Sequence, residues 1–301
     1  MRLGGPIFKK DISVEEEVAL HRKLGFGAAY CKYIEDPLKM IEYKQAYADA
    51  NILLAEFGAY RLNILDTDKT LRQKNVDEIC RRLEYADEMG VRCCVIHGGS
   101  VETGRQGSAN PLNLSEQSIA ETVAVIQGIL DRVKPGTTKL VMETESYLLP
   151  DSPEIYARLI EAIDRSSFAV HLDPVNIISS PRRYYNNAQF IKRCFAVLGP
   201  WIVSCHAKDV YMPPKHTSVQ IDETFIGEGI LDYGTYIKEI EKMSPPPPLM
   251  IEHLTEIQLI KGLKFIFKKA EEVGITFEGS EHREELVDAE GPSGEWFAPH
   301  L

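Results

Sequence analysis

The sequence predicts an α/β fold, a single (β/α)8 barrel, and three observations carry this prediction. Short apolar runs alternate with amphipathic helical segments along nearly the whole chain. Eight strand–helix units of roughly 35 residues each account for the 301 residues, which suits a fold of about 250 residues plus insertions. Neither G-x-G-x-x-G nor G-x-x-x-x-G-K-[ST] follows any expected strand, which argues against the rival doubly wound sheet.

Eight apolar runs are expected to form the barrel strands, because parallel strands buried on both faces read as nearly continuous apolar stretches. In chain order they are residues 2–8, 28–34, 52–60, 91–97, 138–145, 168–173, 201–210 and 249–254. Four prolines at 245–248 directly precede the last run and are expected to stiffen the connection into it.

The segments between these runs carry apolar residues at three- and four-residue spacing, the pattern of a helix with one buried face. Clear examples are residues 13–25, 75–90, 115–133, 152–163 and 255–274. Ser13 and Glu16 have the spacing of a capping box, so the first of these helices is expected to begin just after Ser13. Ser152 precedes another helix, but Ile155 stands where the box needs an acidic residue.

The bulk composition is that of an ordinary globular protein, with 44% hydrophobic and 26% charged residues. We expect one barrel domain over residues 1–278 and a polar C-terminal tail over residues 279–301. The formal net charge is −11. Because proteins that grip a phosphate backbone usually present a basic face, we expect no nucleic-acid partner.

Targeting signals and cysteine usage predict where the protein works. The chain has no run of 18 apolar residues and no apolar stretch near its N-terminus, so we expect neither a membrane span nor a signal peptide. Its six cysteines are scattered and form no C-x-x-C pair, which is typical of reduced, buried thiols. These features predict a cytoplasmic protein without a membrane partner.

Polar residues gather where the expected strands end. In FAVHLDPVNIISS, residues 168–180, His171 and Asp173 lie two apart on a strand and therefore point to the same side. In a barrel of this kind the chemistry lies at the carboxyl ends of the strands. The residues at those ends, from the fourth strand to the eighth, are His97, Glu143, Glu145, His171, Asp173, Asn176, His206, Lys208 and Glu252.

A barrel interior filled with side chains holds several charges only if something compensates them. Glu143, Asp173 and Glu252 bring three negative charges beside the imidazole of His206. A divalent cation such as Mn²⁺ or Mg²⁺ suits mixed carboxylate and imidazole ligands, so we predict that the four residues form one metal site. His253 is expected to face the helix layer, because its neighbour Glu252 faces inward.

At these residues the sequence resembles the xylose isomerase-like TIM-barrel superfamily, in its sugar isomerase and epimerase branch. The resemblance extends to about residue 278 and rests on VIHGGS (95–100), LVMETES (140–146), VHLDPVN (170–176), SCHAKDV (204–210), FIGEGILDY (225–233) and MIEHL (250–254). It implies that Glu143, Asp173, His206 and Glu252 bind one divalent metal ion. Mn²⁺ is expected first, with Mg²⁺, Co²⁺ and Zn²⁺ as alternatives.

The same resemblance implies an isomerase or epimerase of a small sugar or polyol ketone. Glu143 and Glu252 would act on opposite faces of the substrate. One would remove the proton next to the carbonyl to give a cis-enediolate, and the other would return a proton. His171 would lie one layer deeper and orient a ligand. Many relatives carry a histidine where this chain has Asn176, so the substrate contacts of better-known epimerases do not transfer directly.

Three alternatives remain open at this stage. The His-Ala-Lys-Asp run around Lys208 resembles inosose dehydratases and related polyol enzymes, so a lyase on a keto-polyol is one of them. A barrel that binds sugars without catalysis is another. The endonuclease branch is disfavoured, because Glu56 stands where a strand-three histidine is expected and residues 222–224 (Asp-Glu-Thr) replace an Asp-Arg-His run.

The candidate substrate contacts lie around the expected metal site. They are His97, Glu145, Asn176, Lys208 and Arg182. Arg182 and Arg183 lie in the loop after the sixth strand, where a guanidinium could clamp a carboxylate or phosphate, although a pair of solvated loop residues fits the pattern better. The expected partners are a small-molecule sugar or polyol and, as in many family members, further copies of the chain in a homo-oligomer.

Overall fold

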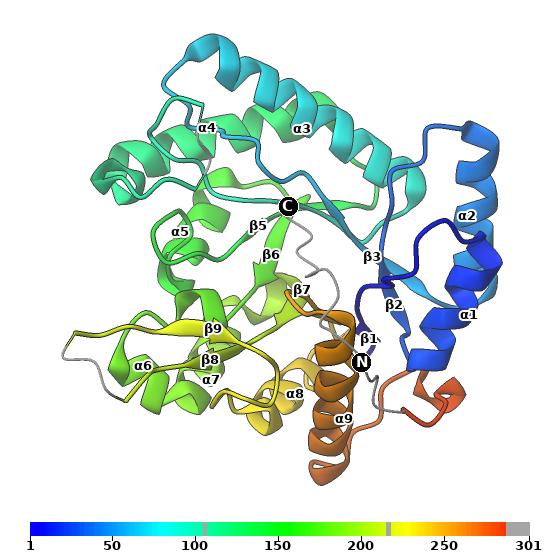
Figure 1. Cartoon of the computed structure of the whole chain (residues 1–301). Coiled ribbons are helices and arrows are strands. Elements are labelled where there is room, and N and C mark those ends of the chain that lie inside the picture. The colour runs from blue at the N-terminus through cyan, green and yellow to red at the C-terminus, as the bar shows by residue number, and fades with distance from the viewer. Residues whose placement is uncertain (105–106, 215–217, 287–301) are drawn as a thin grey trace.

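The structure is a computed structural model that describes residues 1–104, 107–214 and 218–286. Within them, parallel strands close into a barrel in the order β1-β10-β7-β6-β5-β4-β3-β2. Figure 1 shows the helices arranged around these strands. The predicted (β/α)8 barrel is confirmed. No helix of the described residues is long and apolar enough to cross a membrane.

Each expected strand contains one strand of the barrel, shorter than the apolar run that predicted it. The bounds are β1 (Leu3–Gly4), β2 (Ala28–Tyr30), β3 (Leu53–Gly58), β4 (Cys93–Ile96), β5 (Lys139–Glu143), β6 (Phe168–Leu172), β7 (Ile202–Ala207) and β10 (Leu249–Ile251). The expected runs are longer because they include residues beyond the last ladder bond of each strand, many of which are still buried.

The five expected helices are all present. The helices are α1 (Val14–Leu24), α2 (Pro37–Asp49), α3 (Lys69–Met89), α4 (Glu116–Val133), α5 (Pro153–Ile163), α6 (Pro181–Tyr185), α7 (Asn187–Leu198), α8 (Tyr233–Glu241) and α9 (Glu256–Glu272), with short 3-10 turns η1 (Pro111–Leu114), η2 (Val175–Ile177), η3 (Gly199–Trp201) and η4 (Ser280–His282). Ser13 and Glu16 form the predicted capping box. Helix α3 begins well before the expected start, because Asp68 caps it by accepting from the amides of Thr70 and Leu71.

Side chains inside the barrel change from apolar to polar along the strands. Val141 and Ala169 belong to one apolar interior cluster. Two residues further along their strands stand Glu143 and His171, and Asp173 follows two residues after His171. Because residues two apart share a side, the polar layer lies directly above the apolar one, at the carboxyl ends.

The expected strand at 201–210 is divided in two. Strand β7 ends at Ala207, and β8 (Asp209–Tyr211) pairs antiparallel with β9 (Asp222–Thr224) outside the barrel. Asp209 holds the loop that follows, because its carboxylate accepts hydrogen bonds from the amides of Val210, Gly227, Gly229 and Leu231. A β-carbon on Gly229 would lie 2.1 Å from Asp209 Oδ1, so this close approach requires glycine.

The beginning of the expected polar tail packs on the barrel. In η4 and the residues after it, Arg283 lies over the ring of Phe267, and Glu284 pairs with Lys23 of α1 at 2.8 Å. Leu286 contacts the core. Residues 287–301 lie outside the described residues, so the division into a barrel domain and a tail stays a prediction.

We expect Asp209→Asn to lower the free energy of unfolding by about 2 to 4 kcal/mol, because an amide nitrogen would face buried backbone donors and leave them unsatisfied. Chemical denaturation of purified protein measures this change. Glu228→Gln, in the same loop and exposed, is the matched control and should leave stability unchanged. Equal stability of the two variants would contradict the assigned role of Asp209.

Candidate metal centre

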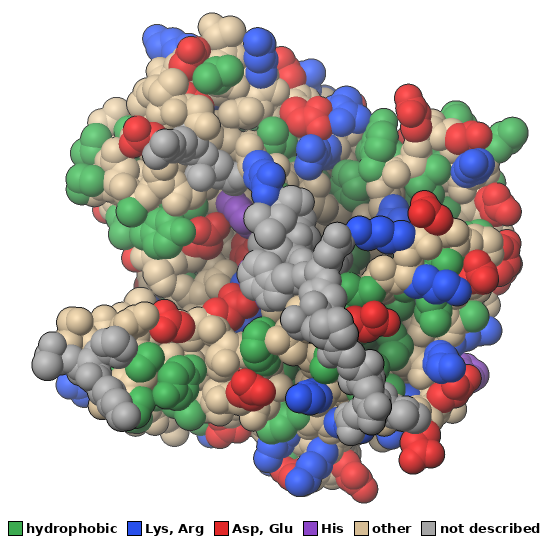
Figure 2. Space-filling model, viewed as in Figure 1, with side chains coloured by type: hydrophobic (Ala, Val, Ile, Leu, Met, Phe, Trp, Pro, Cys, Tyr) green, Lys and Arg blue, Asp and Glu red, His purple; other side chains and the backbone are tan. Residues whose placement is uncertain are grey.

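Four ionisable side chains meet at the carboxyl end of the barrel. Glu143 ends β5, Asp173 follows β6, His206 lies in β7 and Glu252 follows β10, and these strands are neighbours. One ligand atom from each residue lies within 4.8 Å of the other three, and all four residues are at most 1% exposed. The structure thus brings together the residues that the sequence expected to share one site. Figure 2 shows acidic side chains and a histidine around the hollow of this face.

The ring nitrogen Nδ1 of His206 lies at the centre of this cluster. It is 2.8 Å from Glu252 Oε1, 3.2 Å from Glu143 Oε1 and 3.6 Å from Asp173 Oδ2. Asp173 uses its other oxygen, Oδ1, to accept from the amides of Val175 and Asn176, which turns Oδ2 toward the cluster. The donor atoms therefore converge from three sides on one small volume.

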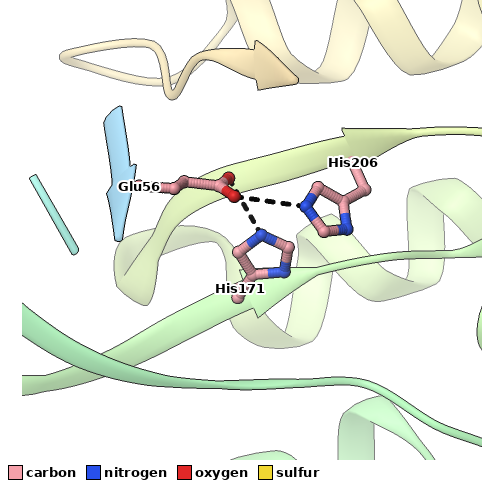
Figure 3. Close-up of side chains that lie close together, drawn as sticks. All are labelled: Glu56, His171 and His206. Carbon is pink, nitrogen blue, oxygen red and sulfur yellow. Dashed lines mark hydrogen bonds and ion pairs between the residues drawn. The ribbon is translucent and has the colours of Figure 1, made fainter. Parts of the chain in front are cut away.

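A second buried group lies beneath the first, and Figure 3 shows how it is arranged. The carboxylate of Glu56, from β3, contacts two imidazole rings. One of its oxygens lies 3.2 Å from His206 Nε2, and the other lies 3.0 Å from His171 Nε2. The hydroxyl of Ser204 donates to the same carboxylate. Because Glu56 holds Nε2, the ring of His206 presents Nδ1 to Glu143, Asp173 and Glu252.

Electrostatic interactions link the upper cluster to the group beneath it. Burial alone would raise the pKa of Glu56, but His171 and His206 outweigh it and lower that pKa to about 2. Burial would lower the pKa of His206, but Glu252, Glu56 and Glu143 outweigh it and raise that pKa well above its usual value. Without a bound ion both groups are therefore charged, and an imidazolium bridges the buried carboxylates. His206 would release its Nδ1 proton on binding a metal ion, because only a neutral imidazole is a ligand.

The upper cluster fits a divalent cation better than the lower one. Glu143, Asp173, His206 and Glu252 supply three carboxylates and an imidazole, a donor set that suits Mn²⁺, Mg²⁺ and Zn²⁺. In the lower group, Glu56 already accepts from two imidazoles and a hydroxyl. The lower group thus acts as the support that orients His206, as expected for the deeper position of His171.

Lys208, the residue between β7 and β8, extends its side chain into the cluster. Its Nζ lies 2.5 Å from Glu252 Oε1, 3.0 Å from Asp173 Oδ2 and 3.6 Å from Glu143 Oε1. Burial would lower the pKa of Lys208, but Asp173, Glu252 and Glu143 outweigh it and hold that pKa well above its usual value. Lys208 is therefore protonated and places a positive charge among the carboxylates.

Three further candidates from the sequence, His97, Glu145 and Asn176, lie at the rim of the cluster. His97, after β4, has Nε2 3.3 Å from Glu143 Oε2 and Nδ1 3.4 Å from Glu145 Oε1. Asn176 donates from Nδ2 to Glu143 Oε1 at 2.9 Å. Burial raises the pKa of Glu145, although His97 opposes it. These three side chains carry the polar surface from the cluster toward the mouth of the barrel.

Two expectations about individual residues differ from the structure. His253 does not face the helix layer: its Nε2 lies 3.7 Å from Glu252 Oε2 and its Nδ1 lies 2.8 Å from Glu223 Oε1. The reason is its backbone, whose φ of 54° breaks the alternation of a strand. Arg182 is exposed on α6, and among the described residues no side-chain contact joins it to the cluster.

A comparison with protein families shows which family the chain belongs to. The sequence profile described as "Xylose isomerase-like TIM barrel" matches residues 19–276. The chain belongs to this family. A search of curated proteins finds no match for the chain.

Solved structures of other proteins share the fold of this xylose isomerase-like barrel. Endonuclease IV from Thermus thermophilus has a TM-score of 0.69 and 15% identity, covering 90% of this chain and 100% of that one. The 3-keto-D-glucoside 4-epimerase YcjR from E. coli has a TM-score of 0.65 and 16% identity, with coverages of 90% and 99%. A xylose isomerase-like protein from Mycobacterium smegmatis, in complex with magnesium, has a TM-score of 0.62 and 13% identity, with coverages of 88% and 91%. At these identities the likeness shows the fold alone.

Sequence reasoning underestimated two residues of this xylose isomerase-like barrel. In the sequence, Glu56 stands out only because it occupies a position where a histidine is expected. A glutamate inside the apolar run ILLAEFGAY also indicates a buried charge that another group compensates. Glu223, which contacts His253 and lies 3.6 Å from Lys208, comes from the hairpin β8–β9. No local pattern predicts the contact with His253, because the two residues are 30 positions apart in the chain.

We expect Glu56→Gln to weaken Mn²⁺ binding about 10- to 100-fold, the usual effect of removing a group that orients a metal ligand. Isothermal titration of metal-free protein measures this change in affinity. Glu102→Gln, an exposed residue after β4, is the control and should bind as the parent protein does. Unchanged affinity in Glu56→Gln would show that His206 needs no support from β3.

Proposed function

We propose that this protein is a divalent-metal-dependent isomerase or epimerase of a small sugar or polyol ketone. One observation carries the proposal: two buried glutamates, Glu143 and Glu252, flank a cluster with Asp173 and His206 at the mouth of the barrel. Strands β6 and β7 separate the strands that bear them. Two carboxylates on either side of a polar centre suit a reaction that removes a proton from carbon and returns one elsewhere.

The four ligands would hold one ion, and Mn²⁺ is the ion we propose first. When bound, it would supply positive charge to stabilise the two oxygens of a cis-enediolate, which derive from the substrate's carbonyl and adjacent hydroxyl groups. Mg²⁺, Co²⁺ and Zn²⁺ suit the same donors. The protein's own contribution is to hold these donors rigidly: Glu56 fixes His206, and the amides of Val175 and Asn176 fix Asp173.

The two glutamates lie in different environments. His206 and Lys208 outweigh the effect of burial and keep the pKa of Glu252 well below its usual value, so its carboxylate is ionised and can accept a proton. Glu143 contacts Asn176 and His97, which orient its two oxygens. In the proposed reaction one glutamate takes the proton from the carbon beside the carbonyl, and the other donates a proton to the resulting enediolate.

The rim residues are proposed to bind the substrate. His97, Glu145 and Asn176 present polar atoms suited to sugar hydroxyls, beside the ring of Tyr60, whose centroid lies 4.9 Å from that of His97. Arg182 is not included, because it is exposed on α6. We propose a small-molecule substrate and no nucleic-acid partner; the cytoplasmic location and a homo-oligomer also stay predictions.

Lys208 favours a second candidate, a lyase that dehydrates a keto-polyol. Enolisation is common to both reactions, so the ligand cluster does not separate them. In the lyase a β-hydroxyl leaves the enediolate, and an ammonium within the cluster, 3.2 Å from Asn176 Oδ1, is placed where it could donate a proton to that hydroxyl. The product distinguishes the two activities.

Proton NMR in D₂O tests the proposed function. The protein is incubated with Mn²⁺ and a panel of free and phosphorylated ketoses and inososes. Deuterium beside the carbonyl together with a new sugar isomer is the expected result. A dehydrated product would assign the lyase instead, and binding of a sugar without any exchange would indicate a non-catalytic barrel.

We expect Glu143→Gln and Glu252→Gln each to lower turnover about 10²- to 10⁴-fold, because each removes a group that moves a proton. Steady-state assays on the substrate found in the panel measure the loss, and metal content is determined on the same samples. Glu102→Gln serves as the control with parental activity. Full activity and full metal occupancy in both glutamine variants would refute the assignment of these residues.

A further inference from the structure

Lys208 is held in an unusual way for a lysine. The residue is only 3% exposed, and its backbone carbonyl accepts a hydrogen bond from the hydroxyl of Tyr233 at 2.8 Å. Its backbone is therefore anchored, while a flexible four-carbon stem carries the ammonium. The conformation of this stem therefore determines which groups the ammonium contacts.

The ammonium contacts the same atoms that an ion would use. Nζ lies 2.5 Å from Glu252 Oε1 and 3.0 Å from Asp173 Oδ2, and these two oxygens lie 2.8 and 3.6 Å from His206 Nδ1. A divalent ion bound by these oxygens would stand about 2 Å from them, so the ammonium and the ion would be close neighbours of like charge. Each positive charge would therefore weaken the contacts of the other with these two oxygens.

A second set of partners lies on the outer side of Lys208. Glu223 Oε2, on β9, is 3.6 Å from Nζ, and Asn176 Oδ1 is 3.2 Å from it. His253 holds the Glu223 carboxylate at 2.8 Å. The side chain of Glu223 is 31% exposed, whereas those of Glu252 and Asp173 are fully buried. A short movement of the stem would thus transfer the ammonium from two buried carboxylates to one at the rim.

We infer that Lys208 is an internal competitor of the metal ion: it neutralises the ligand cluster when no ion is bound, and moves to Glu223 and Asn176 when an ion binds. The inference rests on the proposed function, since it requires the cluster to bind a divalent ion. It makes Lys208 a positioning residue that sets metal affinity. It also places the displaced ammonium at the rim, beside the proposed substrate contacts.

Isothermal titration with MnCl₂ tests this inference on the metal-free protein, with the whole chain present. Lys208→Met removes the competitor, so we expect Mn²⁺ to bind about tenfold or more tightly than to the parent protein. Glu223→Gln removes the outer partner and should weaken binding. Lys32→Met, which breaks the pair of Lys32 with Glu17, is the matched lysine control and should leave Mn²⁺ affinity unchanged.

Thermal unfolding supplies a second readout that does not depend on activity. Metal-free Lys208→Met should unfold at a lower temperature than the metal-free parent, because its buried carboxylates lose their counter-charge, and saturating Mn²⁺ should remove this difference. Unchanged or weaker Mn²⁺ binding by Lys208→Met, with parental binding intact, would overturn the inference alone. If neither protein binds Mn²⁺ at the cluster, the proposed metal-dependent function fails as well.

Discussion

Carboxylates buried within a few ångströms of one another stay ionised only if positive charge lies among them, since burial and mutual repulsion both favour their protonated forms. The mouth of this barrel holds three such groups, Glu143, Asp173 and Glu252. His206 and Lys208 supply the protein's own positive charge. The arrangement of the whole polar layer, from Glu56 below to Glu223 above, follows from this requirement.

The barrel provides the rigidity that such a cluster needs. Each of the four proposed ligands stands near or just beyond the end of a strand, and neighbouring strands fix their spacing. Beneath them Glu56 ties β3 to β6 and β7 through His171 and His206. The side chains that would bind an ion and move protons are thus held by strands, while Lys208 and Glu223 belong to the more peripheral segment after β7.

Much of this could be predicted from the sequence, because a parallel barrel converts local patterns into positions in space. Apolar runs marked the strands, and the two-residue spacing of Glu143 and Glu145 and of His171 and Asp173 predicted which side chains share a side. Contacts that depend on irregular backbone could not be predicted. His253, for example, turns inward because its φ is positive.

The central claim is that Glu143, Asp173, His206 and Glu252 bind one divalent ion. Anomalous diffraction from crystals grown with MnCl₂, recorded on both sides of the manganese absorption edge, tests it most directly. The account predicts one anomalous peak per chain, surrounded by these four side chains. A peak between Glu56 and His171 instead, or no peak in the barrel at saturating Mn²⁺, would contradict it.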